Sequence, residues 1–471
     1  MPDFVGIVLA AGQGTRMKST KPKVLHEIAG RPLAAWTVQA ALDAGASRCV
    51  VVVGHGREEV EATLRARFGE RVQFAHQAEQ LGTGHAVRCA VEAELQEGEG
   101  HAVVLYGDCP AIHPETLERL VAAAEGFPFA LITASLANPK GYGRILRNDA
   151  GNVVGIREDK DCSAEERAIR EVNPGLYAIE LGFLREALGK LDANNAQGEL
   201  YLTDLAEMAA GTPRGVVDVP GDMGELRGIN DRWELSVVGR TLRERILERL
   251  ARSGVGIVDP ATTFVDADCE VEADATIAPG VHLRGRCVVR AGARIDVGCV
   301  LEDVEVAPGA WLKPYTVAAE SQVGRDAQVG PFAHLRPKSD LGEGSKVGNF
   351  CETKKTRIGK GSKVNHLAYV GDGMIGERVN IGAGVIFCNY DGVQKHVTTL
   401  EDDVFIGSDS QLVAPVTIGA GAYVGSGSTI TGDVPADALA IARVRKQTVK
   451  EGFASRLRER FAAAKKAKAE E

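Results

Sequence analysis

The second half of this chain is dominated by an aliphatic residue at every sixth position. The series starts at Val265, Val271 and Ile277 and is still present at Val424 and Ile430. A period of six fits neither an α-helix, which repeats every ~3.6 residues, nor a flat strand, which repeats every ~2. It is the hexapeptide signature of a parallel β-helix, in which each hexad forms one short strand and three hexads complete a triangular coil.

The expected solenoid extends from Ile257 to Ala440. This span gives roughly ten coils and a length of about 48 Å, with ~4.8 Å between stacked strands. Glycine often follows the aliphatic residue, as in IGKGSK and IGAGAY, and permits the turn to the next strand. The pattern is interrupted at Asn389–Thr399, so this segment is expected to leave the solenoid as a loop. Insertions of this kind in repeat proteins are often functional.

In the first half, apolar segments alternate with helical patterns between Val5 and Val219. Strands are expected at Val5–Ala10, Cys49–Gly54, Val72–His76, Ala102–Gly107 and Phe129–Ala137. Helices are expected at Leu33–Ala44, Glu58–Phe68, Thr83–Glu97 and Pro114–Ala124. Near-continuous apolar strands that alternate with helices indicate an α/β domain with a Rossmann-like, mostly parallel sheet.

A charged, proline-free amphipathic segment, Arg232–Ser253, is expected to form a helix that joins the two halves. At 471 residues the chain is too long for one core, because single cores stop growing near ~250–300 residues. We therefore expect an N-terminal domain over residues 1–231, a linker helix over 232–253, and a β-helix domain with its C-terminal tail over 254–471.

The composition limits which classes of partner the protein can bind and in which cellular compartment it can work. A net charge of −9 argues against a nucleic-acid or anionic-membrane partner, which would favour a basic surface. No apolar run approaches the ~20 residues of a membrane helix, and the first residues lack the basic region of a signal peptide. The nine cysteines are scattered and form no C-x-x-C pair, so we expect a reducing, cytoplasmic location.

The first predicted strand leads into the glycine-rich segment LAAGQGTRM, Leu9–Met17. A loop of this kind can direct backbone N–H groups at phosphate oxygens. It is not a Walker A loop, because it has no Gly-Lys-Ser/Thr ending, and Met17 stands where a dinucleotide fingerprint has its third glycine. A tight strand-to-helix turn would use the same glycines, so on their own they leave both interpretations open.

Three further segments are expected at the same edge of the sheet: Lys23 in KPKVL, Gln77–His85 in QAEQLGTGH, and Tyr106–Asp108 in YGD. Ligands of open α/β sheets bind outside the carboxyl ends of the strands. A carboxylate there, Asp108, is a natural Mg²⁺ ligand. Any one of these charges could be a solvated surface group or a turn residue, but together they indicate a phosphate-binding site.

Nine motifs in the first half resemble those of sugar-nucleotide pyrophosphorylases: LAAGQGTRM, KPKVL, QAEQLGTGHA, YGD, GYGRI, IREDKD, NPGLY, NAQGELYLTD and GIN. Over its whole length the chain is similar to the bifunctional UDP-N-acetylglucosamine pyrophosphorylase/glucosamine-1-phosphate N-acetyltransferase family. This resemblance implies a left-handed β-helix. It also implies acetyl transfer from acetyl-CoA to glucosamine 1-phosphate, followed by uridylyl transfer from UTP to N-acetylglucosamine 1-phosphate with release of pyrophosphate.

The resemblance also implies roles for residues of the first half. The uridine nucleotide would contact Leu9, Ala10, Ala11, Gly12, Gln77, Gly82 and Thr83. Tyr106 and Gly107 would also bind substrate. Arg16 and Lys23 would neutralise the triphosphate during catalysis, and Asp108 with Asn230 would bind Mg²⁺. Gly141, Glu158 and Asn173 would bind the sugar, although Pro174 departs from the small or hydroxylated residue expected after that asparagine.

In the second half, His366 interrupts a hexad in NHLAY. A single histidine is more often structural than catalytic, but this one is near Glu352 and other polar residues in the sequence. Acetyl transfer to an amine needs a base with a pKa near 7, which histidine provides. A β-helix that served only assembly or allostery would lack this histidine and the Asn389–Lys395 loop.

The resemblance assigns His366 as the base, with Glu352 orienting or charging it. Glucosamine 1-phosphate would contact Arg336, Lys354, Tyr369, Asn380 and Lys395. Acetyl-CoA or the developing oxyanion would contact Ala383, Asn389, Tyr390, Ser408, Ser426 and Arg443. Ser426 replaces the alanine expected there, and Arg445 stands where the family often has proline.

A flat-sided solenoid offers no deep pocket, whereas three parallel prisms create grooves between neighbours. We therefore expect a homotrimer, which the resemblance also implies, with His366 from one chain and Arg443 from the next in one groove. For the first half, a pyrophosphorylase for another sugar, such as glucose, stays open; NAQGELYLTD and GIN favour N-acetylglucosamine.

Overall fold

The computed structural model describes residues 3–443 and 449–467. The chain divides into two compact units. The first ends at Arg252 and also includes Phe264–Cys269, and the second comprises Ser253–Thr263 and the chain from Glu270 onward. Within the described ranges, no helix combines the length and the apolar character that crossing a membrane requires.

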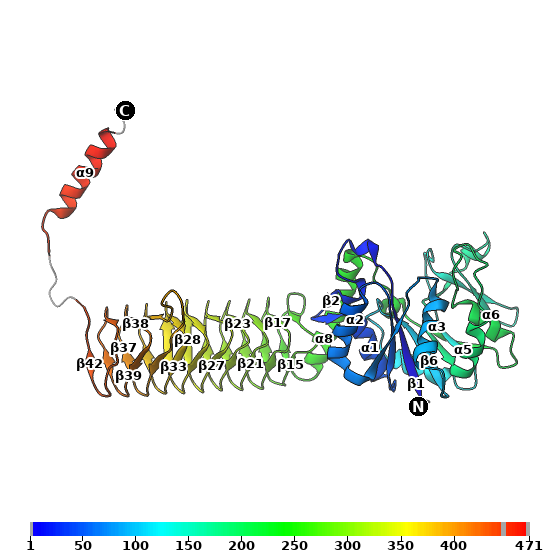
Figure 1. Cartoon of the computed structure of the whole chain (residues 1–471), viewed down its shortest axis with the longest axis horizontal. Coiled ribbons are helices and arrows are strands. Elements are labelled where there is room, and N and C mark those ends of the chain that lie inside the picture. The colour runs from blue at the N-terminus through cyan, green and yellow to red at the C-terminus, as the bar shows by residue number, and fades with distance from the viewer. Residues whose placement is uncertain (1–2, 444–448, 468–471) are drawn as a thin grey trace. The chain divides into compact units, whose positions relative to one another are not determined.

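The first unit is built on a ten-stranded sheet (Figure 1). Its path is β5-β4-β1-β6-β11-β7-β10-β8-β9, and β12 pairs with β7. The strands are β1 Phe4–Ala10, β4 Cys49–Val53, β5 Val72–His76, β6 His101–Tyr106, β7 Phe129–Ser135, β8 Gly143–Arg147, β9 Val153–Arg157, β10 Glu171–Asn173, β11 Tyr177–Glu180 and β12 Val216–Pro220. A small separate hairpin pairs β2 Glu27–Ile28 with β3 Arg31–Pro32.

The predicted parallel core is confirmed, because β5, β4, β1 and β6 pair in parallel. Elsewhere in the sheet β12 also pairs in parallel with β7, whereas β11 and β10 run antiparallel to their neighbours. Helices pack on both faces of the sheet and form two separate apolar cores. They are α1 Leu33–Asp43, α2 Arg57–Phe68, α3 Thr83–Glu94, α4 Pro114–Ala123, α5 Leu181–Leu188, α6 Asp204–Ala210 and α7 Met223–Leu226.

The long helix α8 spans Arg232–Arg252, as the amphipathic pattern predicts. Its buried Val238 and Leu242 pack with Ile28 and Ile229 in a small cluster of their own. The Arg232 Nε donates to the Met17 carbonyl at 3.1 Å. The start of α8 is thereby attached to the loop that follows β1.

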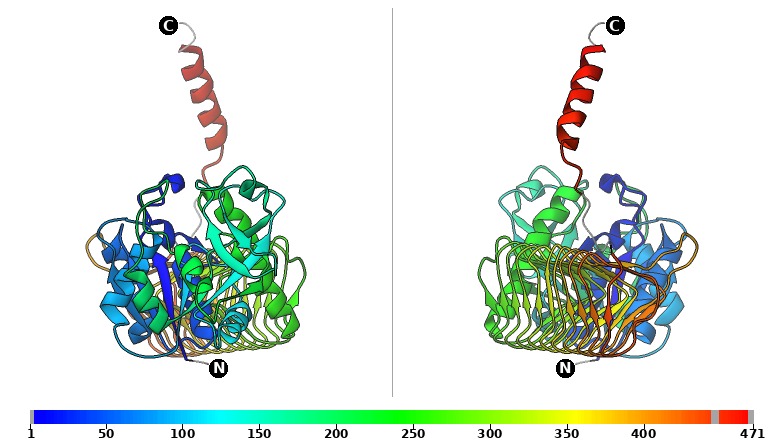
Figure 2. Two further views of the ribbon diagram at one scale, coloured as in Figure 1. Left: turned by 90° about the vertical axis from the view of Figure 1, so that its right-hand side faces the viewer. Right: turned by 90° about the vertical axis from the view of Figure 1, so that its left-hand side faces the viewer.

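The second unit is a left-handed parallel β-helix of stacked coils, seen end-on in Figure 2. Its three parallel sheets form the faces of a triangular prism, here called face 1, face 2 and face 3. Face 1 contains β13 Gly256–Ile257, β16 Thr276–Ile277, β19 Arg294–Ile295, β22 Trp311–Leu312, β25 Gln328–Val329, β28 Lys346–Asn349, β31 Lys363–His366, β34 Asn380–Ile381, β37 Phe405–Ile406, β40 Tyr423–Val424 and β42 Leu439–Ala440.

Face 2 contains β14 Phe264–Val265, β17 His282–Arg284, β20 Val300–Glu302, β23 Val317–Ala319, β26 His334–Leu335, β29 Glu352–Lys354, β32 Tyr369–Gly371, β35 Ile386–Cys388, β38 Gln411–Val413 and β41 Thr429–Ile430. Face 3 contains β15 Glu270–Val271, β18 Val288–Val289, β21 Glu305–Val306, β24 Gln322–Val323, β27 Ser339–Leu341, β30 Thr356–Ile358, β33 Gly373–Ile375, β36 Thr398–Leu400 and β39 Val416–Ile418. The last helix, α9, spans Phe453–Ala467.

The predicted aliphatic ladder fills the interior of the coils. Val265, Ile277, Leu301 and Val424 are almost fully buried, and the residues beside them on each strand point outward. Buried polar residues also occur inside the coils; in one pair, the Ser339 hydroxyl hydrogen bonds to that of the equally buried Thr353 at 2.8 Å. Pairing these two hydroxyls avoids the free-energy cost of burying either one alone.

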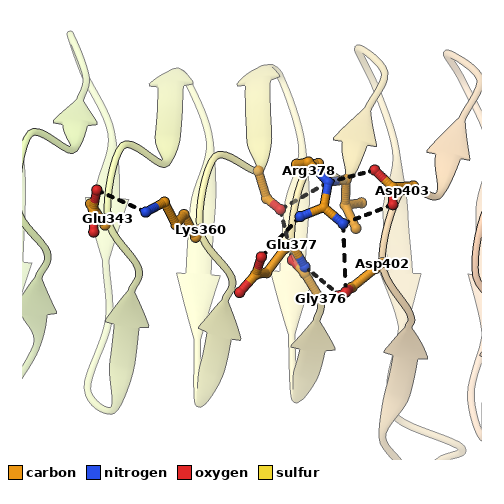
Figure 3. Close-up of polar contacts among 9 residues, drawn as sticks. Glu343, Lys360, Gly376, Glu377, Arg378, Asp402 and Asp403 are labelled. Atoms are coloured by element: carbon orange, nitrogen blue, oxygen red, sulfur yellow. Dashed lines mark hydrogen bonds and ion pairs between the residues drawn. The ribbon is translucent and has the colours of Figure 1, made fainter.

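Ion pairs connect successive coils along the corner between face 3 and face 1 (Figure 3). Lys360 pairs with Glu343 of the preceding coil, with Nζ and Oε1 3.0 Å apart. Arg378 pairs with Asp403 of the following coil, with Nε and Oδ1 2.7 Å apart, and this contact lowers the pKa of Asp403. All these groups are exposed, so solvent screens the pairs.

Candidate functional site

The loop after β1 is shaped by two glycines with different roles. Gly14 has a φ of 61°, and a Cβ there would collide with the Lys23 side chain. A Cβ at Gly12 would meet open space. Gly14 therefore lets the loop lie against Lys23, while Gly12 leaves the backbone accessible to a ligand.

A cavity of about 310 Å³ opens at the carboxyl ends of β1 and β6. Of the predicted site residues, it is lined by Leu9, Ala10, Ala11, Gly12, Lys23, Gln77, Gly82, Thr83, Tyr106 and Asp108. Segments far apart in the sequence thus meet where an α/β sheet binds its ligands. The lining also includes Gln80 and Glu199, for which the sequence analysis assigned no role. Both belong to motifs quoted there, QAEQLGTGHA and NAQGELYLTD.

Two glutamine side chains fix the cavity wall. The buried Gln77 amide donates to the Gly82 carbonyl at 3.1 Å and contacts His85 Nδ1 at 3.2 Å. Gln80 donates to the Ala11 carbonyl at 2.8 Å. Gly82 has a φ of 105°, and a Cβ there would lie only 2.6 Å from the Leu200 carbonyl. A larger residue at position 82 would therefore disturb the turn that carries Thr83.

Two side-chain oxygens accept hydrogen bonds from one cation at the edge of this cavity. The Lys23 ammonium forms an ion pair with Asp108 and lies 3.4 Å from Asn230 Oδ1. Asn230 Oδ1 also accepts a hydrogen bond from Arg16 at 2.7 Å. The predicted ligands Asp108 and Asn230 therefore share a position suited to positive charge. Within the described ranges no cluster of three or more His, Cys, Asp or Glu that could hold a metal ion is found.

The predicted sugar residues lie outside the lining of the cavity. Burial raises the pKa of Glu158, whose carboxylate accepts from the Thr203 hydroxyl at 3.1 Å. Asn173 is buried and donates to the Tyr177 hydroxyl at 2.6 Å, while its Oδ1 accepts from the Gly175 N–H. A Cβ on Gly175 would collide with the Tyr106 ring, so this turn adjoins the cavity. Gly141 lies in an exposed loop with a φ of 88°.

A second set of predicted residues lies on face 2 of the β-helix. Glu352 and Tyr369 are register partners on the neighbouring strands β29 and β32. Arg336, just after β26, pairs with Glu352, with Nη1 and Oε1 2.8 Å apart. The expected pairing of Glu352 with His366 is therefore not the one observed, because Arg336 is the partner of that carboxylate.

Three cations gather at the corner between face 2 and face 3, where the face 2 strands end. Contact with Lys395 and the nearby charge of Arg336 lower the pKa of Lys354. Lys395 comes from the loop after β35, and Lys354 ends β29. Side chains of like charge meet here without a carboxylate between Lys354 and Lys395, an arrangement that suits a phosphate group.

The loop itself is a compact hairpin, in agreement with its predicted exit from the solenoid. Tyr390 and Lys395 form an antiparallel bridge. Asp391 accepts from the Gln394 and Val393 N–H groups and pairs with His396, contacts that lower the pKa of Asp391. The hairpin is thus internally braced, which holds Lys395 in place.

Asn389 anchors this hairpin to the solenoid. It is buried, and its amide donates to Asp372 at 2.5 Å. A Cβ on Gly371 would lie 2.5 Å from the Tyr369 hydroxyl and 2.6 Å from the Asn389 amide nitrogen. The glycine therefore leaves room for Tyr369 and Asn389 to approach one another.

His366 ends β31 and is exposed. Its Nδ1 lies 2.9 Å from Oδ1 of Asn349, its register partner on β28. The predicted CoA residues Ala383, Ser408 and Ser426 follow the same corner between face 1 and face 2 in later coils. Arg443 donates to the Ser426 carbonyl, so it lies on this corner as well. Asn380 instead begins β34 on face 1. Arg445 lies outside the described residues.

His366 and Arg443 both lie along one corner of this chain. The expectation that they meet from different chains stays a prediction. Asn380 lies on face 1, whereas Lys354 and Tyr369 lie on face 2.

Comparison with known proteins supplies independent findings. The family model of the MobA-like NTP transferase domain matches residues 6–159, and that of the bacterial transferase hexapeptide (six repeats) matches residues 398–432. The bifunctional protein GlmU of Sorangium cellulosum is 55% identical over 464 residues, which is 97% of each chain. That of Anaeromyxobacter sp. is 52% identical over 454 residues, covering 96% of this chain and 93% of the relative. That of Geobacter sulfurreducens is 46% identical over 483 residues, covering 98% and 100%.

Proposed function

The chain belongs to the family of bifunctional GlmU proteins, and from this premise we propose which of its residues carry each activity. The chain is both a nucleotidyltransferase and an acetyltransferase, and its two activities together make UDP-N-acetylglucosamine. The acetyltransferase activity acetylates glucosamine 1-phosphate with acetyl-CoA. The nucleotidyltransferase activity joins N-acetylglucosamine 1-phosphate to the uridylyl group of UTP. We assign these activities to residues 254–471 and 1–231, with 232–253 as the linker.

For uridylyl transfer, the proposed site is the cavity lined by Gly12, Gln77 and Asp108, with Glu158 and Asn173 toward the sugar. A phosphate oxygen of N-acetylglucosamine 1-phosphate attacks the α-phosphorus of UTP; the new P–O bond forms as the bond to the β-phosphate breaks, and pyrophosphate leaves. Arg16 and Lys23 neutralise the repelling anions, so catalysis is positioning and charge stabilisation. Mg²⁺, held by Asp108 and Asn230 when bound, would supply further positive charge.

For acetyl transfer, His366 is the proposed base. The amine nitrogen of glucosamine 1-phosphate attacks the thioester carbonyl; the C–N bond forms and the C–S bond breaks. The amine proton passes to His366 and from there to the departing thiolate of CoA. The Arg336, Lys354 and Lys395 cations would bind the sugar phosphate, a role that the mutual approach of Lys354 and Lys395 supports.

We propose that acetyl transfer takes place in a homotrimer, at grooves between neighbouring β-helices. Two faces of one prism point in different directions, so Asn380 on face 1 would serve the face 2 residues of a neighbour. A ridge of exposed apolar residues supports this assembly. Tyr315, Phe332 and Phe350 stack along one corner with ring centroids 5.2 and 5.5 Å apart, and Leu367 continues the line. These side chains are 49–60% exposed in one chain, as expected of a surface that a partner covers.

The nine cysteines are scattered and form no C-x-x-C pair, which supports activity in a reducing compartment that we take to be the cytoplasm. The substrates are small molecules: UTP, N-acetylglucosamine 1-phosphate, glucosamine 1-phosphate and acetyl-CoA.

The two assignments are tested by measuring both activities on each of two full-length variants. Asp108→Ala should abolish UTP-dependent turnover and leave acetyl transfer intact. His366→Ala should lower acetyl transfer by about 10²–10⁴-fold, as loss of a general base does, and leave uridylyl transfer intact. His282→Ala, in an earlier coil of face 2, is the control and should change neither. Loss of both activities in one folded variant would refute the separation of the sites.

A further inference from the structure

Two neighbouring strands of face 1 are longer than the others. In the described part of this face, β28 and β31 are four residues long and every other strand has two. The extra length brings Asn349 opposite His366 in the parallel register. The Leu367 N–H donates to the Asn349 carbonyl at 3.1 Å, which fixes the two strand ends against each other.

Glycine makes this close approach possible. A Cβ on Gly348 would collide with the Asn365 carbonyl of the neighbouring strand. The residues that follow, Asn349 and His366, therefore face each other at hydrogen-bond distance, with Asn349 Oδ1 and His366 Nδ1 2.9 Å apart. No other side-chain hydrogen bond to the His366 ring is found among residues 3–443 and 449–467, and the Glu352 carboxylate is paired with Arg336.

We propose that Asn349 is the positioning residue that sets the tautomer of His366. The inference rests on the proposed role of His366 as base. With the proton on Nδ1 and donated to Asn349 Oδ1, the lone pair of the neutral imidazole is on Nε2, the nitrogen that is free to accept the amine proton. The opposite tautomer would put a hydrogen on Nε2 and leave no base at that position.

This arrangement differs from one in which a carboxylate stabilises the positive charge of the histidine. An amide oxygen orients the ring without the strong electrostatic stabilisation of imidazolium that a carboxylate provides. A carboxylate at position 349 would stabilise imidazolium, so the proposal can be tested by the pH profile of an Asn349→Asp variant.

The experiment compares kcat and KM of acetyl transfer across pH in full-length variants. Asn349→Leu, which keeps the approximate shape but cannot accept a hydrogen bond, should lower kcat by about 10-fold or more while KM for glucosamine 1-phosphate stays within a factor of about 3. Asn349→Asp should restore most of kcat at high pH. The acid limb of its profile should move up by about one pH unit, because the carboxylate favours imidazolium.

Asn365→Leu, on the same strand as His366, is the matched control and should leave the profile unchanged. The thermal unfolding curve of every variant reports on folding of the β-helix. An unshifted acid limb in Asn349→Asp, or wild-type kcat in Asn349→Leu, would overturn the proposal. If Asn349→Leu does not fold, the Asn349→Asp profile decides alone. His366→Ala distinguishes a failure of the base assignment from a failure of this inference. If His366→Ala is active, the assignment of His366 as base fails, and the role of Asn349 fails with it. If His366→Ala is inactive and the Asn349→Asp profile is unshifted, only the role of Asn349 is refuted.

Discussion

Asp204, at the start of α6, is a carboxyl group that works against stability at neutral pH. Burial, together with the nearby Asp192 and Glu207, raises its pKa to about 6 from 3.8. The folded state thus holds this proton more tightly than the unfolded chain, so the free energy of unfolding falls as pH rises from about 4 to 6.

We predict that Asp204→Asn raises the free energy of unfolding at pH 7.5 by about 1 kcal/mol, less than the pKa shift alone implies because the half-exposed carboxyl is screened by solvent. The gain should vanish below about pH 4, where aspartate is protonated in both states. Thermal unfolding at the two pH values measures it, with the exposed Asp149→Asn as a control that should shift neither transition. Equal stabilisation at both pH values would show that ionisation is not the cause.

Individual site residues were predictable to the extent that they belong to contiguous motifs. Gly12, Gln77 and Asp108 were identified, and the structure brings them into one cavity. Asn349 was missed, because its contact with His366 joins residues of different coils. The partner of Glu352 was wrong for the same reason: sequence proximity does not say which of several polar groups in successive coils meet.

At the scale of elements, the interior ladder and the exterior ion pairs of the β-helix contribute differently to stability. Leu312→Ala removes a fully buried side chain from the coil interior and should lower the free energy of unfolding by about 2–5 kcal/mol. Arg378→Ala breaks the exposed pairs with Asp402 and Asp403 and should leave the melting temperature nearly unchanged, since solvent already screens those charges. Thermal unfolding of both variants makes the comparison. A larger loss in Arg378→Ala would mean that the charged corner is the main support of the solenoid.

Elements with a single strong pattern were predictable, and those without one were not. The hexads and the buried parallel strands β1, β4 and β6 carry continuous apolar signals. The short β8–β12 segments were not predicted; they contain exposed or half-buried positions, and β10 and β11 pair antiparallel with strands distant in the sequence. Such pairing depends on tertiary contacts, which the local periodicity of the sequence does not indicate.

At the scale of the whole molecule, shared grooves predict a pattern of rescue between inactive chains. Subunits with Lys354→Ala mixed with subunits with Asn380→Ala should regain part of the acetyltransferase activity. A mixed trimer then has at least one groove with an intact lysine from one chain and an intact asparagine from the next. Mixing Lys354→Ala with Tyr369→Ala, both on face 2 and expected to serve a groove from the same chain, is the matched control and should give no rescue. An active monomer in sedimentation, or no rescue in proven mixed trimers of the first pair, would contradict the arrangement.

The hairpin after β35 leaves the solenoid between two interior rungs, and the ladder resumes with Leu400 stacked in register on Ile375. Each coil depends mainly on its immediate neighbours, so a segment can lengthen at a corner without any compensating change in the core. Changes in the loops and changes in the core can therefore evolve separately. Mutations in the hairpin can change which acetyl acceptor is bound, while selection on the β-helix scaffold is unaffected. Proteins of this fold can therefore acquire new activities through changes in the corner loops alone.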